Sequence, residues 1–80
     1  MRIKIKYFGL IAEAVGKGEE QIEVPNACTI EELERVLKEQ QPVLLNKQFK
    51  VAINHSIIHQ QGVELKATDE LALLPPFAGG

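Results

Sequence analysis

The first residues of the chain alternate between apolar and polar side chains. Ile3, Ile5 and Tyr7 share one parity, whereas two lysines and Phe8 occupy the other. A period of two is typical of a strand that buries one of its faces. We therefore predict a strand over residues 2–8.

Three later segments also have the character of strands. The first ends at Val24, just before a proline, and is predicted to pair with the opening strand. The second covers 49–53, followed by a turn at Asn54 and His55 and a further short strand. The third is "TDELALL", residues 68–74, in which two leucines alternate with more polar or smaller side chains.

Two segments have the period of a helix instead. "GLIAEAVG" predicts a short helix that ends at Gly16, since glycine suits the left-handed position after a helix. "CTIEELERVLKEQQP" predicts the main helix, in which Thr29 and Glu32 form a capping box and Pro42 limits the far end. Its apolar side, including a hydrophobic staple at the start, consists of Cys28, Ile30, Leu33, Val36 and Leu37. Its exposed side has two pairs spaced for ion pairing, Glu31 with Arg35 and Glu34 with Lys38.

This order of elements predicts the fold class. The helices are too few to cover both faces of a sheet, so we expect an α+β fold with one main helix packed on one face. Residues 1–74 would form the domain, and residues 75–80 an extended tail that ends in Gly-Gly.

Composition narrows the possible functions. The chain has 80 residues, of which 45% are hydrophobic and 25% charged, which is typical of one globular domain with little room for a deep pocket. Nine basic and eleven acidic residues are mixed along it, so we expect no nucleic-acid or membrane surface. A single cysteine and the lack of a secretory signal or a long apolar run favour the cytoplasm.

Both the order of elements and the tail resemble known proteins. The order is similar to the β-grasp of ubiquitin-like proteins, and "LLPPFAGG" resembles the end of the sulfur-carrier small subunits of molybdopterin synthases. The specific part is the double proline at 75–76 followed by Ala-Gly-Gly at 78–80. Phe77 departs from the smaller aliphatic residue expected between them.

The resemblance implies a role for the last residue. A ubiquitin-activating-like adenylating enzyme would use ATP to convert Gly80 to an acyl-adenylate, and a sulfur donor protein would then supply the sulfur of a thiocarboxylate. Gly80 would deliver that sulfur inside the large subunit of molybdopterin synthase, within a heterotetramer, to turn precursor Z into the dithiolene of molybdopterin. The chain itself would bind no cofactor, and its sequence contains no phosphate-binding loop motif.

The residue types of the tail suit this chemistry. A carboxylate must be activated before sulfur can attack it, and Gly79 and Gly80 lack the Cβ atoms that would hinder entry into another protein's active site. Pro75 and Pro76 favour an extended segment that rises about 3.1 Å per residue, so six residues reach roughly 18 Å.

A partner surface can be predicted at the base of the tail. Phe8 and Leu74 have the parity that faces away from the main helix, and the first and last strands of a β-grasp are neighbours. They would form an exposed apolar patch, with Ile57 as a third member, of the kind that marks interfaces. The alternative is that they close a small second core under the 42–48 loop.

Other residues are weaker candidates. Cys28 lies near a helix start, where a thiolate is favoured, but its staple position favours a packing role. His55 and His59 would meet as metal ligands only on a helix, and their segment has the pattern of strands. Two other functions stay open: a sulfur carrier for thiamine synthesis or tRNA thiolation, and a noncovalent β-grasp interaction module.

Overall fold

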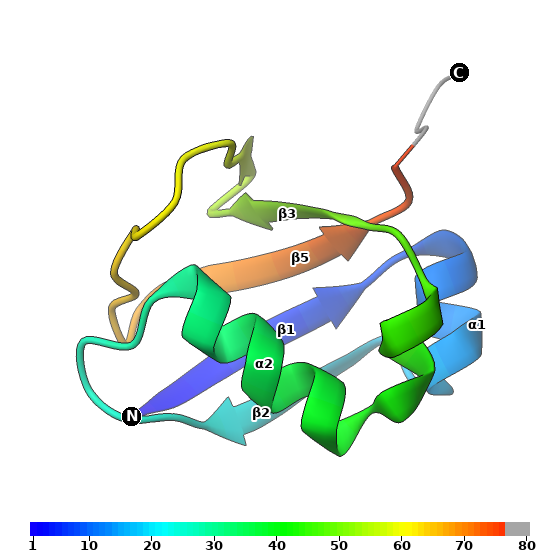
Figure 1. The fold of residues 1–80 in the computed structure, drawn as a ribbon, viewed down its shortest axis with the longest axis horizontal. Coiled ribbons are helices and arrows are strands. Elements are labelled where there is room, and N and C mark those ends of the chain that lie inside the picture. Colours follow the sequence, from blue (N-terminus) through cyan, green and yellow to red (C-terminus); the bar gives the residue numbers. More distant parts are fainter. Residues whose placement is uncertain (77–80) are drawn as a thin grey trace.

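Five strands form one mixed sheet in the computed structural model, which describes residues 1–76 (Figure 1). The spatial order is β2-β1-β5-β3-β4. The two central strands, β1 and β5, run parallel, and the other neighbours are antiparallel. The strands are β1 (Arg2–Tyr7), β2 (Glu19–Glu23), β3 (Lys50–Ile53), β4 (Ser56–Ile57) and β5 (Glu70–Leu74).

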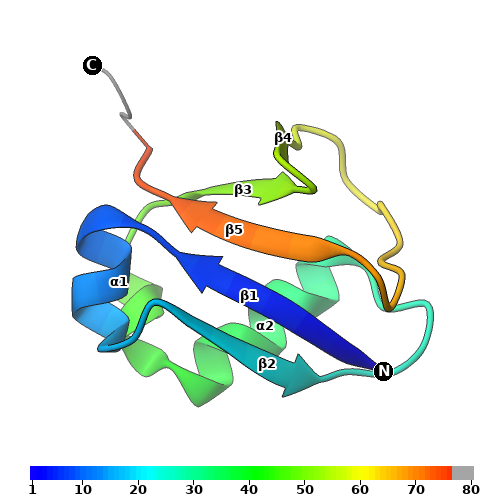
Figure 2. The same cartoon turned by 180° about the vertical axis from the view of Figure 1, so that it is seen from behind.

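The main helix, α2 (Ile30–Gln40), crosses one face of this sheet (Figure 1). The shorter α1 (Gly9–Val15) lies at the end of the sheet where β1 and β5 finish, close to the 3-10 helix η1 (Pro42–Asn46). Seen from behind, the strands lie in front of α2, so the opposite face of the sheet has no helix on it (Figure 2). The predicted α+β architecture is confirmed. No helix in residues 1–76 is long and apolar enough to span a membrane.

Local sequence explains where α2 begins and ends. The Glu32 backbone N–H donates to Thr29 Oγ1 at 3.3 Å, and the Thr29 N–H donates to Glu32 Oε1 at 2.9 Å. This is the predicted capping box. The helix ends at Gln40, and Pro42 begins the next element. The predicted end of α1 is also confirmed, since Gly16 has a φ of +89°.

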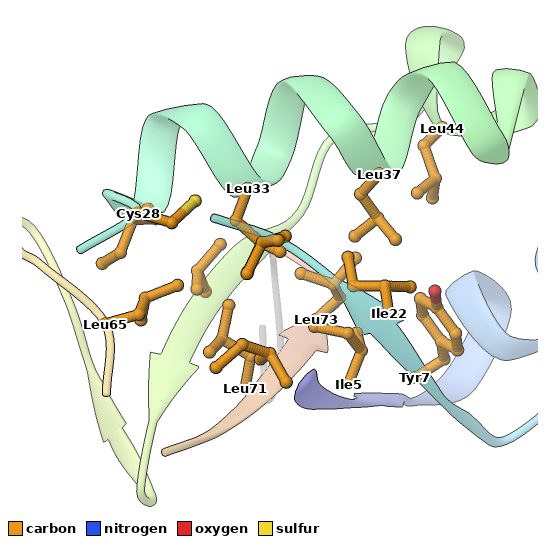
Figure 3. Packing of buried hydrophobic residues seen from close by; sticks show 14 of the residues in the cluster. Ile5, Tyr7, Ile22, Cys28, Leu33, Leu37, Leu44, Leu65, Leu71 and Leu73 are labelled. Atoms are coloured by element: carbon orange, nitrogen blue, oxygen red, sulfur yellow. The ribbon is translucent and has the colours of Figure 1, made fainter. Parts of the chain in front are cut away.

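The core lies between α2 and the sheet. Leu33 and Leu37 point from α2 toward Ile5, Leu71 and Leu73 on the central strands (Figure 3). Full burial of a side chain of this kind contributes roughly 1.5–3 kcal/mol. The inward parity predicted for β1 and β5 is therefore confirmed. Seven large side chains are less than 2% exposed: Ile3, Ile5, Leu33, Leu37, Leu44, Leu71 and Leu73.

Two predictions around α2 are wrong. Neither predicted ion pair of the helix is within 4.0 Å among the described residues. Lys38 instead lies over the ring of Phe49, with Nζ 5.7 Å from the ring centre, because the aromatic face offers an attractive site for a cation. The predicted loop at 42–48 instead contains the 3-10 helix over 42–46, which begins at Pro42 and places Leu44 in the core, completely buried.

Candidate functional site

The tail begins where β5 ends. Leu74 is the last residue of that strand, and Pro75 and Pro76 continue the chain as partly buried residues. The Phe8 backbone N–H donates to the Leu73 carbonyl at 3.2 Å, which attaches the end of β5 to the end of β1. We call Pro75 and Pro76 the tail root. The predicted functional residues Phe77, Ala78, Gly79 and Gly80 lie outside the described residues.

The strand register brings the three predicted partner residues to one face of the sheet. In β5, Ala72 and Leu74 have the parity opposite to the buried leucines. Ala72 lies opposite Ala52 of β3, and Ala52 lies opposite Ile57 of β4, so all three share a face. Phe8 keeps an extended backbone, with φ −126° and ψ 151°, and therefore continues the parity that faces away from α2.

We call Phe8, Ala52, Ile57, Ala72 and Leu74 the open-face patch. Phe8 and Ile57 are 43% and 44% exposed, and Leu74 is partly buried. The 42–46 segment buries Leu44 in the main core and leaves Phe8 exposed, so the structure does not support the alternative of a second core at Phe8. The patch lies on the face that Figure 2 shows. Phe8 and Leu74 lie where β1 and β5 end, beside the tail root, whereas Ile57 lies in β4, on the far side of β3. Its role in binding stays a prediction.

Sequence reasoning missed Ala52 as part of this surface. It is 4% exposed, although it lies outside the core cluster beneath α2. Its neighbours across the strands, Ala72 and Ile57, belong to the open-face patch, so Ala52 lies on the open face. The signal that could have found it is the register between β3 and β5, which a single sequence does not contain.

The rest of the open face is charged. Lys4 and Lys6 of β1 contact Glu70 of β5, at 3.9 and 3.4 Å, and Lys4 also lies 3.6 Å from Glu19 of β2. Arg2 lies 3.4 Å from Glu23 further along the same pair of strands. The open face is therefore polar along β1 and β2. Lys50 of β3, which has the parity of Ala52 and lies opposite Leu74, adds a positive charge beside the apolar residues near the tail root.

Cys28 and the histidines do not form a reactive site within residues 1–76. Cys28 is 2% exposed in the core, and burial raises the pKa of its thiol, so the structure favours the packing role. His55 occupies the turn after β3 and His59 follows β4. No group of three His, Cys, Asp or Glu side chains among the described residues is arranged to hold a metal ion.

A polar cluster on the other side of the sheet surrounds Glu20. Its Oε2 accepts hydrogen bonds from the Tyr7 hydroxyl and from Gln41 Nε2, the latter at 3.2 Å, and Lys17 Nζ lies 3.4 Å from Oε1. Partial burial acts to raise the pKa of Glu20, but the bonds from Tyr7 and Gln41 and the charge of Lys17 outweigh it, so the pKa lies below its ordinary value. Burial and the neighbouring carboxylate raise the pKa of Tyr7, which stays a hydrogen-bond donor.

Comparison of the sequence with known proteins shows the family to which the chain belongs. The ThiS family model matches residues 5–80. A protein from Caenorhabditis briggsae named molybdopterin synthase sulfur carrier subunit is 33% identical over 81 residues, which cover 98% of this chain and 96% of that protein.

Solved structures agree in fold. The small archaeal modifier protein 1 of Methanosarcina acetivorans superposes with a TM-score of 0.77 at 26% identity, covering 99% of this chain and 96% of that one. A chain from the complex of subunits 1 and 2 of the molybdopterin-converting factor of Helicobacter pylori superposes with a TM-score of 0.71 at 25% identity, over the full length of both. The architecture is a ubiquitin-like β-grasp, and the chain belongs to the ThiS family, where it is similar to the sulfur carrier subunits of molybdopterin synthase.

Proposed function

We propose that this protein is the sulfur-carrier subunit of a molybdopterin synthase and that Gly80 carries the sulfur. The observation that carries this proposal is the similarity, over nearly the whole chain, to a protein named for that activity. The position of the tail root supports it, because Pro75 and Pro76 leave the sheet beside the open-face patch. A partner that binds the patch can therefore receive the tail.

The proposed chemistry has two activation steps. The Gly80 carboxylate attacks the α-phosphorus of ATP on an adenylating enzyme, which expels pyrophosphate and leaves an acyl-adenylate. The outer sulfur of a persulfide on a donor protein then attacks the acyl carbon and AMP leaves. A thiol of the donor attacks the inner sulfur of the resulting acyl disulfide, which frees the Gly80 thiocarboxylate and leaves the donor as a disulfide. ATP belongs to the activating enzyme, since the sequence of this chain has no phosphate-binding loop motif.

The thiocarboxylate is then consumed in a complex with the large subunit. There the Gly80 sulfur would form a C–S bond with precursor Z, and water would then release Gly80 as a carboxylate. Two such transfers, within a heterotetramer, would supply the two sulfurs of the dithiolene. The similarity to a chain of a solved complex of subunits 1 and 2 supports a large-subunit partner. We propose that the open-face patch is the contact surface and that the domain of residues 1–74 positions the tail of residues 75–80. We propose the cytoplasm as the compartment, because the one cysteine of the chain, Cys28, forms no disulfide bond.

Intact mass spectrometry tests the activation directly. Incubation with the activating enzyme, ATP and a sulfur donor should raise the mass by the difference between one sulfur and one oxygen, and fragmentation should place the change at Gly80. A known carrier treated in parallel provides the positive control. If that carrier is converted and this chain keeps its mass, the proposed function is wrong.

Two tail variants test whether the position of the carboxylate matters. Deleting Gly80, or adding one alanine after it, moves the carboxylate by about one residue, roughly 3 Å. Because reacting groups must be closely aligned, product formation should collapse. The melting temperature and binding to the large subunit should change little, because the changed residues lie beyond β5. Full product formation by an extended chain that is not trimmed back would contradict the mechanism.

A second candidate is protein modification by the same carboxylate. The likeness to a protein titled small archaeal modifier protein 1 favours it. In that case Gly80 would form an amide bond with an amino group of a target protein, and gel electrophoresis under denaturing conditions would show larger covalent adducts after activation.

A carrier that acts only in thiamine synthesis or tRNA thiolation would form the thiocarboxylate without supporting molybdopterin formation.

A further inference from the structure

Gly9 is the first residue of α1, two positions after the end of β1, and lies next to the tail root. A Cβ atom at Gly9 would lie 3.1 Å from Pro75 Cγ and 3.8 Å from Pro75 Cδ. Carbon atoms that are not bonded prefer separations of about 3.5–4.0 Å. Pro75 therefore packs against the backbone of Gly9 at a distance that any other residue type would disturb.

This contact distinguishes Gly9 from the other glycines of the described chain. Gly9 has a φ of +55°, a left-handed conformation that Gly16 and Gly62 share, with φ of +89° and +75°. A Cβ at Gly16, Gly18 or Gly62 would meet nothing within 4 Å. Backbone conformation therefore explains a glycine at three of these positions, whereas only Gly9 adds close contact with the tail root.

The surroundings of Pro75 let it move without unfolding the domain. On one side, the hydrogen bond from the Phe8 N–H to the Leu73 carbonyl holds the strand ends together just before the root. On another, a hollow of about 230 Å³ is lined by Leu10, Pro75 and Pro76 together with the 46–48 segment. Because Pro75 borders this hollow and is only partly buried, a shift of the root by a few tenths of an ångström should leave the core in place.

We propose that Gly9 is a positioning residue for the tail: its missing side chain lets Pro75 lie against the end of β1, and this contact sets the direction in which the chain leaves β5. The inference rests on the proposed function, because it concerns how Gly80 reaches a partner's active site. At about 3.1 Å per residue, the five residues after Pro75 span roughly 15 Å when extended there. A shift of the root therefore also shifts the carboxylate at the end of this segment.

The test compares Gly9→Ala with Gly16→Ala. Both variants place alanine at a left-handed position and share that conformational cost, but only Gly9→Ala disturbs Pro75. We expect Gly9→Ala to lower the maximal rate of Gly80 thiocarboxylate formation about 3- to 10-fold relative to Gly16→Ala. This is less than the roughly 100-fold effect of a 1 Å misplacement, because the required shift is smaller. The carrier concentration that gives half-maximal rate should stay nearly unchanged, since the substitution leaves the surface of the domain outside the tail root as it is.

Pro75→Ala supplies the rescue. Alanine lacks both ring atoms that approach Gly9, so adding Gly9→Ala to a Pro75→Ala chain should change the rate less than about 2-fold if the contact is the cause. Asparagine tolerates left-handed backbone better than alanine, so Gly9→Asn and Gly16→Asn replace the alanine pair if the latter lowers the folded fraction. Nuclear Overhauser contacts between the Gly9 Hα and Pro75 Hγ protons check the packing in the wild-type chain.

The outcomes separate the two proposals. Equal maximal rates for the Gly9 and Gly16 variants, an undiminished Gly9 effect in the Pro75→Ala chain, or a missing Gly9–Pro75 contact in the wild type would overturn the role of Gly9 alone. A wild-type chain that stays unconverted, beside a known carrier that is converted, would overturn the proposed function and with it any role of Gly9 in delivery.

Discussion

Glu20 connects β2, β1 and the segment after α2 through its hydrogen bonds to Tyr7 and Gln41. Removing the Tyr7 hydroxyl by Tyr7→Phe keeps the ring in the core and deletes one bond to a charged group. Such bonds contribute about 1.5–3 kcal/mol. Because Glu20 keeps some contact with solvent, we expect the free energy of unfolding to fall by about 1–2 kcal/mol near pH 7, as measured by urea denaturation.

The sign of the pH dependence follows from the lowered pKa of Glu20. A carboxyl whose pKa is lower in the folded state stabilises the fold above its unfolded pKa, and this contribution is lost as the pH falls through the folded pKa. The difference between wild type and Tyr7→Phe should therefore shrink as unfolding is repeated at successively lower pH. Glu19→Gln, which removes only an exposed ion pair with Lys4, is the control. A Tyr7→Phe difference that is independent of pH would contradict this account.

At the scale of elements, the start of α2 is the clearest test of local sequence. Replacing Thr29 by alanine removes the side chain that accepts the Glu32 N–H, and loss of such a cap lowers the free energy of unfolding by about 0.5–2 kcal/mol. Thr29→Ser keeps the hydroxyl and should recover most of that loss. Chemical denaturation of the three proteins provides the comparison, and equal stabilities for the alanine and serine variants would show that the capping box does not stabilise α2.

At the scale of the whole molecule, the open-face patch is the contact surface that we propose for a partner. Phe8→Asp or Leu74→Asp should weaken binding to the large subunit by about 1–3 kcal/mol if these residues contribute as hot spots. The matched control is Leu45→Asp, because Leu45 is 65% exposed but lies in η1, beside the outer side of α2. Calorimetric titration gives the affinities, and circular dichroism shows whether each variant is folded. Normal binding by both patch variants, or unfolding of Phe8→Asp, would contradict the interface assignment.

The sequence by itself determined the features that depend on neighbouring residues. Strand parity in β1 and β5 and the capping box of α2 follow from side chains a few positions apart, and the structure confirms each of them. The patch was predictable in part for the same reason, since Phe8 and Leu74 show their parity within their own strands. The proposal for Gly80 also came from a local motif and stays a prediction.

Only the tertiary structure decided the features that depend on segments far apart in the chain. Ala52 becomes part of the open face through the register of β3 against β5, and the contact of Gly9 with Pro75 arises because β1 and β5 finish side by side. Lys38 contacts the Phe49 ring and not its predicted partner Glu34, because the fold brings Phe49 close to it. In each case the deciding energy is a contact between residues more than ten positions apart, which hydrophobic periodicity along one segment does not encode.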